Sequence, residues 1–297
     1  MNDKGMKILQ WIGKVCLWLG AMILLGMGAI LIWYFASGGS QEVTSLKWGQ
    51  FIQTVGLFLL PPLLCAVVYD AHSNPFRWLH LDKGANWKTF VLAVAVMLCA
   101  LPAINLLVDL NSRMVLPESL HGLEQWMKEF EEAAEQLMEK FLQTDSVWGM
   151  LVNIGLIALL PAISEELTFR GTLQQLLQGD AGQEGTAKWK VHAAIWGAAI
   201  IFSAIHFQFY GFVPRMIMGA MFGYAFVWTG SLWVPIIMHF TNNFMVVVLT
   251  YGFDRYAPDS KNYADTFGAG TTWWVGVISL VLMCALLWLL YRSTRKE

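Results

Sequence analysis

The sequence predicts an all-α protein, a polytopic membrane helical bundle of about eight transmembrane helices. Of its 297 residues, 57% are hydrophobic and only 13% are charged, against roughly 25% charged in a typical soluble domain. Uncharged runs recur at lengths near the ~20 residues that a helix needs to span a bilayer. These runs cover residues 15–41, 48–69, 89–108, 146–164, 191–214, 216–253 and 266–291. The turn signal at residues 229–231 divides the run 216–253 into two helices, which gives eight spans.

Net charge and cysteine usage exclude several classes of protein. The net charge is −2 and no sizeable basic patch exists, so we expect no nucleic-acid partner. The four cysteines fall inside predicted spans without metal-ligand spacing, which argues against a disulfide framework or a zinc knuckle. The first apolar run is too long for a signal-peptide core, so we expect a retained helix. We expect no cofactor.

The distribution of charge between the spans predicts the topology. Basic residues gather before the first span and after the second, fourth and last spans. The positive-inside bias places these segments and both termini in the cytoplasm, for a multi-pass protein of the cell (inner) membrane. The segment 109–146 carries nine Asp or Glu against three Lys or Arg and is expected on the opposite side.

The acidic segment contains a predicted amphipathic helix at residues 118–142. Apolar residues recur at helical spacing from Leu120 to Phe141. The other face carries Glu124, Glu129, Glu131, Glu132, Glu135 and Glu139. We expect the helix to pack across the outer ends of the bundle; a lid over a substrate entrance is the alternative. We divide the chain into an N-terminal part, 1–144, with three spans and this helix, and a catalytic membrane domain, 145–297.

Two adjacent glutamates follow the uncharged run 146–164 and are the first candidate site residues. A charge at membrane depth costs about 2.5–3.5 kcal/mol even on the lenient insertion scale, so such residues usually have a function. Glu166 and Arg170 are four residues apart, a favourable spacing for a helical ion pair. That pairing leaves Glu165 without a local partner, which suits a general base. In the alternative, both glutamates are simply solvated at the cytoplasmic interface.

Two histidines and an asparagine complete the set of candidates. His206 follows Phe202 on one helix face within an apolar stretch, where a histidine that only packs in the core is the alternative. His239 and Asn243 lie one turn apart, and an imidazole and a carboxamide aligned in this way can donate hydrogen bonds to one oxyanion. Hydrogen bonding between helices is the alternative for this pair.

The three motifs together resemble a known family. Residues 165–170 resemble the EExxxR motif of the CAAX-prenyl-protease and bacteriocin-processing family of intramembrane glutamic endopeptidases (the CPBP family). Residues 202–206 are similar to its FxxxH motif, and residues 239–243 to its HxxxN motif. The resemblance covers roughly residues 145–250 and implies a helical-bundle peptidase that needs no metal, acting on a membrane-associated peptide or protein substrate in the lipid bilayer.

The resemblance also implies a role for each motif residue. Glu165 would activate a water molecule with the help of His206, and His239 and Asn243 would form the oxyanion hole. The remaining pair, Glu166 and Arg170, would set the geometry; in the alternative, Glu166 also takes a share of the base function.

Two other functions remain open at this point. A zinc-dependent membrane metalloprotease would use a glutamate with His206 and His239 as ligands. A transporter or a chaperone of membrane proteins would use the same polar cluster without catalysis. The sequence does not identify a substrate.

Overall fold

The computed structural model describes residues 3–69, 74–179, 188–260 and 266–295, and within these ranges the chain is helical without a strand. The predicted all-α fold class is therefore confirmed. In chain order the helices are α1 (Asp3–Ser37), α2 (Val43–Thr54), α3 (Leu60–Tyr69), α4 (Pro75–Trp78), α5 (Trp87–Ser112), α6 (His121–Leu142), α7 (Val147–Asn153), α8 (Leu160–Thr168), α9 (Gln175–Gln178), α10 (Lys188–Ala204), α11 (Phe212–Thr229), α12 (Trp233–Tyr256) and α14 (Trp273–Thr294).

Several of these helices are joined by wide or tight helical turns. The π-helical turns η1 (Val55–Leu59), η3 (Ile154–Leu159) and η4 (Phe169–Gln174) make continuous rods of α2–α3 and of α7–α8–α9. Short 3₁₀ turns, η2 (Glu118–Leu120), η6 (Pro258–Ser260) and η7 (Gly270–Thr272), lie next to α6, α12 and α14.

Six helical segments are long and apolar enough to cross a membrane. They are Gly5–Ser37, Val43–Tyr69, Trp87–Ser112, Val147–Gln178, Trp233–Tyr256 and Gly270–Thr294. The protein is thus a multi-pass membrane bundle. The other two predicted spans correspond to α10 and α11, which pack against each other as a hairpin.

The structure corrects the limits of two predicted spans. The run 191–214 is not one helix, because α10 ends at Ala204 and α11 begins at Phe212. The uncharged run ends at Arg215, but this residue lies in the first turn of α11, so the charge does not mark the helix boundary. The fourth span does not end at Ser164; it continues through the charged residues to Gln178.

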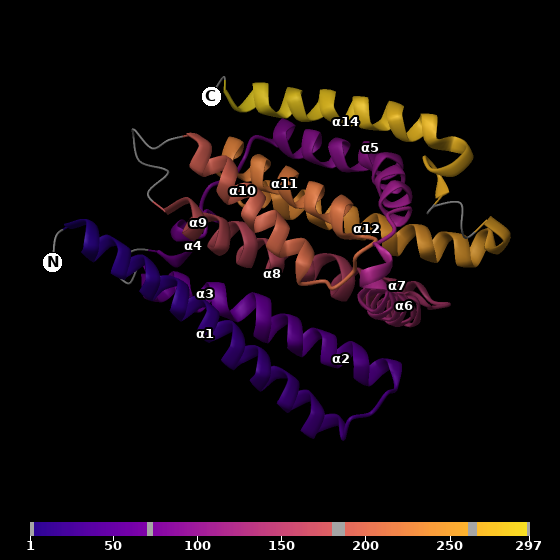
Figure 1. The fold of residues 1–297 in the computed structure, drawn as a ribbon, viewed down its shortest axis with the longest axis horizontal. Coiled ribbons are helices and arrows are strands. Elements are labelled where there is room, and N and C mark those ends of the chain that lie inside the picture. The colour runs from indigo at the N-terminus through magenta and orange to yellow at the C-terminus, as the bar shows by residue number, and fades with distance from the viewer. Residues whose placement is uncertain (1–2, 70–73, 180–187, 261–265, 296–297) are drawn as a thin grey trace.

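Different segments of the chain lie at the two ends of the bundle. Figure 1 shows the N- and C-termini at the same end of the bundle, with α4 and α9. Figure 1 also places α6 and α7 at the opposite end, where α6 is seen almost end-on and so crosses the direction of the spans. This arrangement agrees with an even number of crossings; which end faces the cytoplasm stays a prediction.

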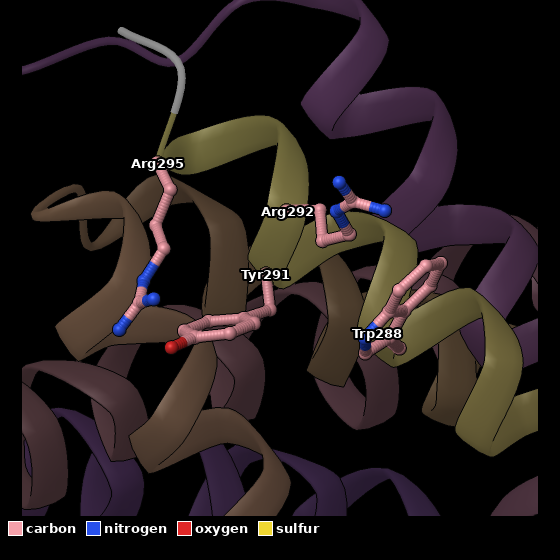
Figure 2. A pocket seen from close by; sticks show the side chains of 4 residues that line it. All are labelled: Trp288, Tyr291, Arg292 and Arg295. Carbon is pink, nitrogen blue, oxygen red and sulfur yellow. The ribbon is translucent and has the colours of Figure 1, made fainter.

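Aromatic and arginine side chains mark the C-terminal end of α14. A hollow of about 360 Å³ is lined by Trp288, Tyr291, Arg292 and Arg295. Figure 2 shows these four side chains on the last turns of α14. The guanidinium of Arg292 lies 4.7 Å from the Trp288 ring centroid, and that of Arg295 lies 4.6 Å from Tyr291. Aromatic rings and arginines are typical of the interface between a membrane and water, so this cluster is expected to anchor the end of the last span.

The apolar core lies where α5, α11, α12 and α14 meet. Its largest cluster is centred on Met97, Phe222 and Met238, all of which are buried. A second cluster joins α1 and α3 to α10 around Phe169 and Phe202. The candidate site residues lie on α8, η4 and α12 and in the turn after α10, between these two clusters.

Helix α6 lies across one end of the bundle, as expected, and contacts α2, α7 and α12. The face that α6 turns toward the protein differs from the predicted apolar face. Glu131 was assigned to the acidic outer face, but it is only 8% exposed. Leu123, Trp126 and Phe130 are instead more than 40% exposed. Helical periodicity gives the angles between residues, but it does not tell which side of the helix meets the protein.

Candidate active site

Glu166 and Arg170 form a buried ion pair in the middle of the fourth span. Nη1 of Arg170 lies 2.7 Å from Oε1 of Glu166, and the two side chains are 1% and 0% exposed. The predicted pairing is therefore present. Only 14% of the Glu165 side chain is exposed, so the alternative of two glutamates solvated at the membrane surface is wrong. Removing one partner of such a buried pair typically costs about 3–5 kcal/mol.

Arg170 is held on all sides by neighbouring helices. Its Nη2 donates to the carbonyl oxygen of Gly219 on α11 at 2.8 Å. The guanidinium carbon lies 4.8 Å from the centroid of the Phe202 ring and 5.3 Å from that of Phe222. Such cation–π contacts are strongest when the cation is desolvated. Arg170 therefore fixes the carboxylate of Glu166 relative to α10 and α11.

Two glycines on α11 allow this close packing. A Cβ atom at Gly219 would lie 3.2 Å from Nη2 of Arg170, and one at Gly223 would lie 2.7 Å from Oε1 of Gln174. The side-chain amide of Gln174 donates to the carbonyl oxygen of Gly223 at 3.3 Å. Small residues four apart are typical of helices that approach closely in membranes. The sequence reading missed this Gly-x-x-x-Gly pattern, although its spacing could have revealed it.

His239 lies between the two glutamates. Its Nδ1 is 2.9 Å from Oε1 of Glu166, and its Nε2 is 3.9 Å from Oε2 of Glu165. A carboxylate accepts hydrogen bonds, so Nδ1 carries a proton. The ring stacks on Phe222 with 5.4 Å between centroids. His239 is therefore fixed in both position and orientation.

The second nitrogen of the His239 ring, Nε2, lies on the Glu165 side of the site. Because Nδ1 already carries a proton, Nε2 can donate a hydrogen bond only in the imidazolium form of the ring.

His206 lies in the turn after α10 and not within a helix, contrary to its expected position in the fifth span. Its Nδ1 is 2.7 Å from the carbonyl oxygen of Phe202, so Nδ1 donates and Nε2 of the neutral ring is an acceptor. The Phe202 ring contacts both His206 and His239, at 5.2 and 5.9 Å between centroids. One aromatic side chain thus separates the two histidines.

Asn243 donates a hydrogen bond to a backbone carbonyl that lies four residues before a proline. Pro161 has no N–H, so the carbonyl of Ile157, four residues earlier, lacks its α-helical partner. Nδ2 of Asn243 donates to this oxygen at 3.2 Å, and Oδ1 of Asn243 accepts from Asn242 at 3.1 Å. These two hydrogen bonds fix the orientation of the Asn243 amide. The amide carries a second N–H, and no hydrogen bond joins Asn243 to His239 in the described residues.

The described residues contain no group of three or more His, Cys, Asp or Glu side chains arranged to hold a metal ion. Oε1 of Glu166 is already shared by Arg170 and His239. The ligand set that a zinc enzyme would need is therefore not preformed among these side chains.

Arg215 is a charged neighbour of the site that the sequence reading did not select. It is partly buried in the first turn of α11, and its Nη2 donates to Oε1 of Gln208 at 2.6 Å. Electrostatic interactions link Arg215 to Glu165 and Glu131. The signal in the sequence was the single charge that separates the uncharged runs 191–214 and 216–253.

The fold and this cluster define a class of protein: a polytopic helical bundle with two glutamates, an arginine and two histidines gathered inside it. Residues 147–245 match the model of the Rce1-like family, described as type II CAAX prenyl endopeptidase Rce1-like. This segment contains all three motifs, so the resemblance that they indicated is confirmed there. Helix α6 and all spans before residue 147 lie outside the match.

One relative is similar over part of the same chain. It is the "Uncharacterized protein YpbD" of Bacillus subtilis (strain 168), which is 32% identical over 92 residues. The aligned segment is 30% of this chain and 40% of the relative, so the chain spans less than half of that protein. No solved structure matches this chain.

Proposed function

We propose that this protein is an intramembrane endopeptidase that hydrolyses a peptide bond of a membrane-associated peptide or protein with a water molecule activated by Glu165. One observation carries the proposal: His239 lies between two glutamates with different environments. Glu166 is fully buried and bonded to Arg170 and His239. Glu165 is partly exposed and faces Nε2 of His239 across 3.9 Å, so it is the carboxylate that remains available for a water molecule.

The reaction then needs only groups of this chain, water and the peptide. Glu165 takes a proton from the water as its oxygen adds to the peptide carbonyl carbon. The carbonyl oxygen becomes an oxyanion. When the C–N bond breaks, the proton on Glu165 passes to the leaving nitrogen, which gives a carboxyl group and an amine. Glu165 returns to its starting state without a covalent intermediate.

The oxyanion would be stabilised by two donors on α12. Nε2 of the protonated His239 is one, and the second N–H of the Asn243 amide is the other. Both are already oriented, His239 by Glu166 and Asn243 by Ile157. Donors that are oriented in advance in a site of low dielectric constant are among the largest contributions to catalysis.

His206 would hold the water molecule. Its Nδ1 is occupied by the carbonyl of Phe202, so its Nε2 can accept a hydrogen bond from the water and orient an oxygen lone pair toward the substrate. Glu166 and Arg170 would not touch the substrate; they fix His239.

The test compares protein termini in membranes from cells that express either the parent protein or Glu165→Gln. Mass spectrometry of peptides and new termini should find cleavage products that occur only with the parent protein. Glu132→Gln, on the exposed side of α6, is the matched control and should give the parent pattern. A quenched fluorescent peptide with a prenylated CAAX end serves as a second substrate probe. Identical termini in all three samples, with no cleavage of the probe, would contradict the proposal and favour a non-enzymatic membrane protein.

A further inference from the structure

The turn that carries His206 has a strained backbone. Residues 205–211 connect α10 to α11, and Phe207, directly after His206, has φ 52°. This left-handed conformation is unfavourable for a bulky L-residue. Such strain persists only where the surrounding structure enforces it, and it is often found at functional sites.

Side chains from three helices hold this turn. From α5, Nδ2 of Asn111 donates to the carbonyl oxygen of Phe209 at 2.8 Å. From α10, Oγ of Ser203 donates to the carbonyl oxygen of Phe212 at 2.7 Å. From α6, Oε2 of Glu131 accepts the backbone N–H of Tyr210 at 2.8 Å.

Glu131 differs from the neighbouring acidic residues of α6. Its side chain is buried, whereas Glu129 and Glu132 are exposed. Its charge is partly offset by Arg215, which itself bonds to Gln208 in the same turn. A carboxylate that accepts a backbone N–H in a desolvated setting makes one of the stronger types of hydrogen bond. Glu131 is therefore built into the turn.

We propose that Glu131 is a positioning residue for the reaction: from α6 it holds the strained turn that presents His206 to the site. The ring of Phe130, the preceding residue, lies 6.3 Å from that of Phe207 and contacts the same turn. The proposal rests on the proposed function, because His206 has a catalytic role only there. It makes α6, which lies outside the matched family segment, a working part of the site.

The first arm of the test measures hydrogen exchange of the full-length protein in lipid nanodiscs. Peptides that cover residues 205–212 are compared between the parent protein and three variants. Glu131→Ala should speed exchange at the Tyr210 amide about 10-fold or more, because a hydrogen bond to a charged group is lost. Glu131→Gln keeps a carbonyl acceptor but loses the charge, so its rate should lie between those of Glu131→Ala and the parent. Glu132→Ala, on the exposed face, should change nothing.

The second arm measures turnover of a quenched fluorescent peptide that carries the cleavage sequence found in the membrane comparison. Glu131→Ala should lower kcat about 10-fold with KM unchanged, and Glu131→Gln should restore most of it. The double variant Glu131→Ala/His206→Ala should be no slower than His206→Ala alone, because a positioning residue acts only through the group that it positions.

The outcomes separate this proposal from the proposed function. Unchanged exchange in Glu131→Ala would overturn the proposal. Faster exchange with unchanged kcat, or losses that multiply in the double variant, would also overturn it and leave Glu131 a purely structural residue. A parent protein that cleaves no peptide would contradict the proposed function and, with it, a positioning role in catalysis; the exchange arm would still decide whether Glu131 holds the turn.

Discussion

Nδ1 of His239 lies 2.9 Å from Oε1 of Glu166, and this contact gives the two adjacent glutamates different environments. Glu166 is saturated on one oxygen by His239 and Arg170. Glu165 faces the other nitrogen of the same ring at a longer distance. The imidazole of His239 thus lies beside both carboxylates. Glu166 is held by hydrogen bonds, whereas Glu165 can act on a water molecule.

Substitution of Arg170 should affect folding, whereas substitution of Glu165 should affect only chemistry. Arg170→Ala removes the cation of the buried ion pair and leaves Glu166 with His239 alone, which is expected to cost about 3–5 kcal/mol. Glu165→Gln keeps the shape of a partly exposed side chain and should leave the thermal midpoint in detergent near that of the parent while turnover is lost. Scanning fluorimetry and peptide cleavage on the same samples separate the two effects. Parent-like turnover in Glu165→Gln would assign the base to another residue.

A methyl group at Gly219 should disturb the arginine. The added Cβ of Gly219→Ala would lie 3.2 Å from Nη2 of Arg170 and from the Phe202 ring, and overpacking of this kind costs about 1–3 kcal/mol. Gly252→Ala on α12 is the control, because a Cβ there meets nothing within 4 Å. We expect a lower thermal midpoint and lower turnover for Gly219→Ala only. Equal values for the two variants would show that Arg170 has room to move.

Loss of the Asn243 amide should slow turnover without weakening substrate binding. Removing one oxyanion donor typically costs about 10²–10³-fold in kcat. Asn243→Ala should therefore lower kcat to that extent with KM little changed in steady-state peptide cleavage. Asn242→Ala removes only a hydrogen bond that Asn243 accepts and should have a smaller effect. A loss confined to KM would place Asn243 in substrate binding.

Chelation should leave the reaction intact. In the proposed mechanism His206 and His239 make hydrogen bonds through Nδ1 to Phe202 and Glu166, and no step requires a metal ion. Peptide cleavage after exhaustive treatment with a chelator, followed by dialysis, should equal that of untreated protein. Activity that disappears on chelation and returns with added zinc, while Asn243→Ala remains active, would support the metalloprotease alternative.

Reporter fusions should place the two ends of the bundle on opposite sides of the membrane. Gly84 lies in the segment between α4 and α5, and Gly122 lies in α6. Figure 1 shows α4 at the end of the bundle that also holds the termini, and α6 at the other end. The positive-inside bias predicts the first in the cytoplasm and the second outside. Reporters of compartment fused after these residues should give opposite signals. The same signal from both would contradict a crossing of the membrane by α5, which lies between them.

Part of this site could be predicted from the sequence because helical spacing determines which side chains share a face. The pairing of Glu166 with Arg170 is an example of this rule. Contacts between helices follow no such rule, so the approach of His239 to both glutamates required the structure. The limits of α10 were misjudged because absence of charge indicates apolarity and not helix length. Glu131 was misplaced because a periodic pattern does not say which side of a helix is covered.

The rod that carries the glutamate pair contains two π-helical turns, η3 before α8 and η4 after it. A π turn closes its hydrogen bonds from residue i to residue i+5, so it holds about one residue more than an α turn of the same rotation. One 3.6-residue periodicity therefore does not run through the whole rod, and the residues that share a face before η3 are one position out of phase with those after it. Ile157, which binds the Asn243 amide, lies within that turn. Helical spacing counted back from Glu165 and Glu166 would therefore assign the wrong residues before η3 to the face of the glutamates.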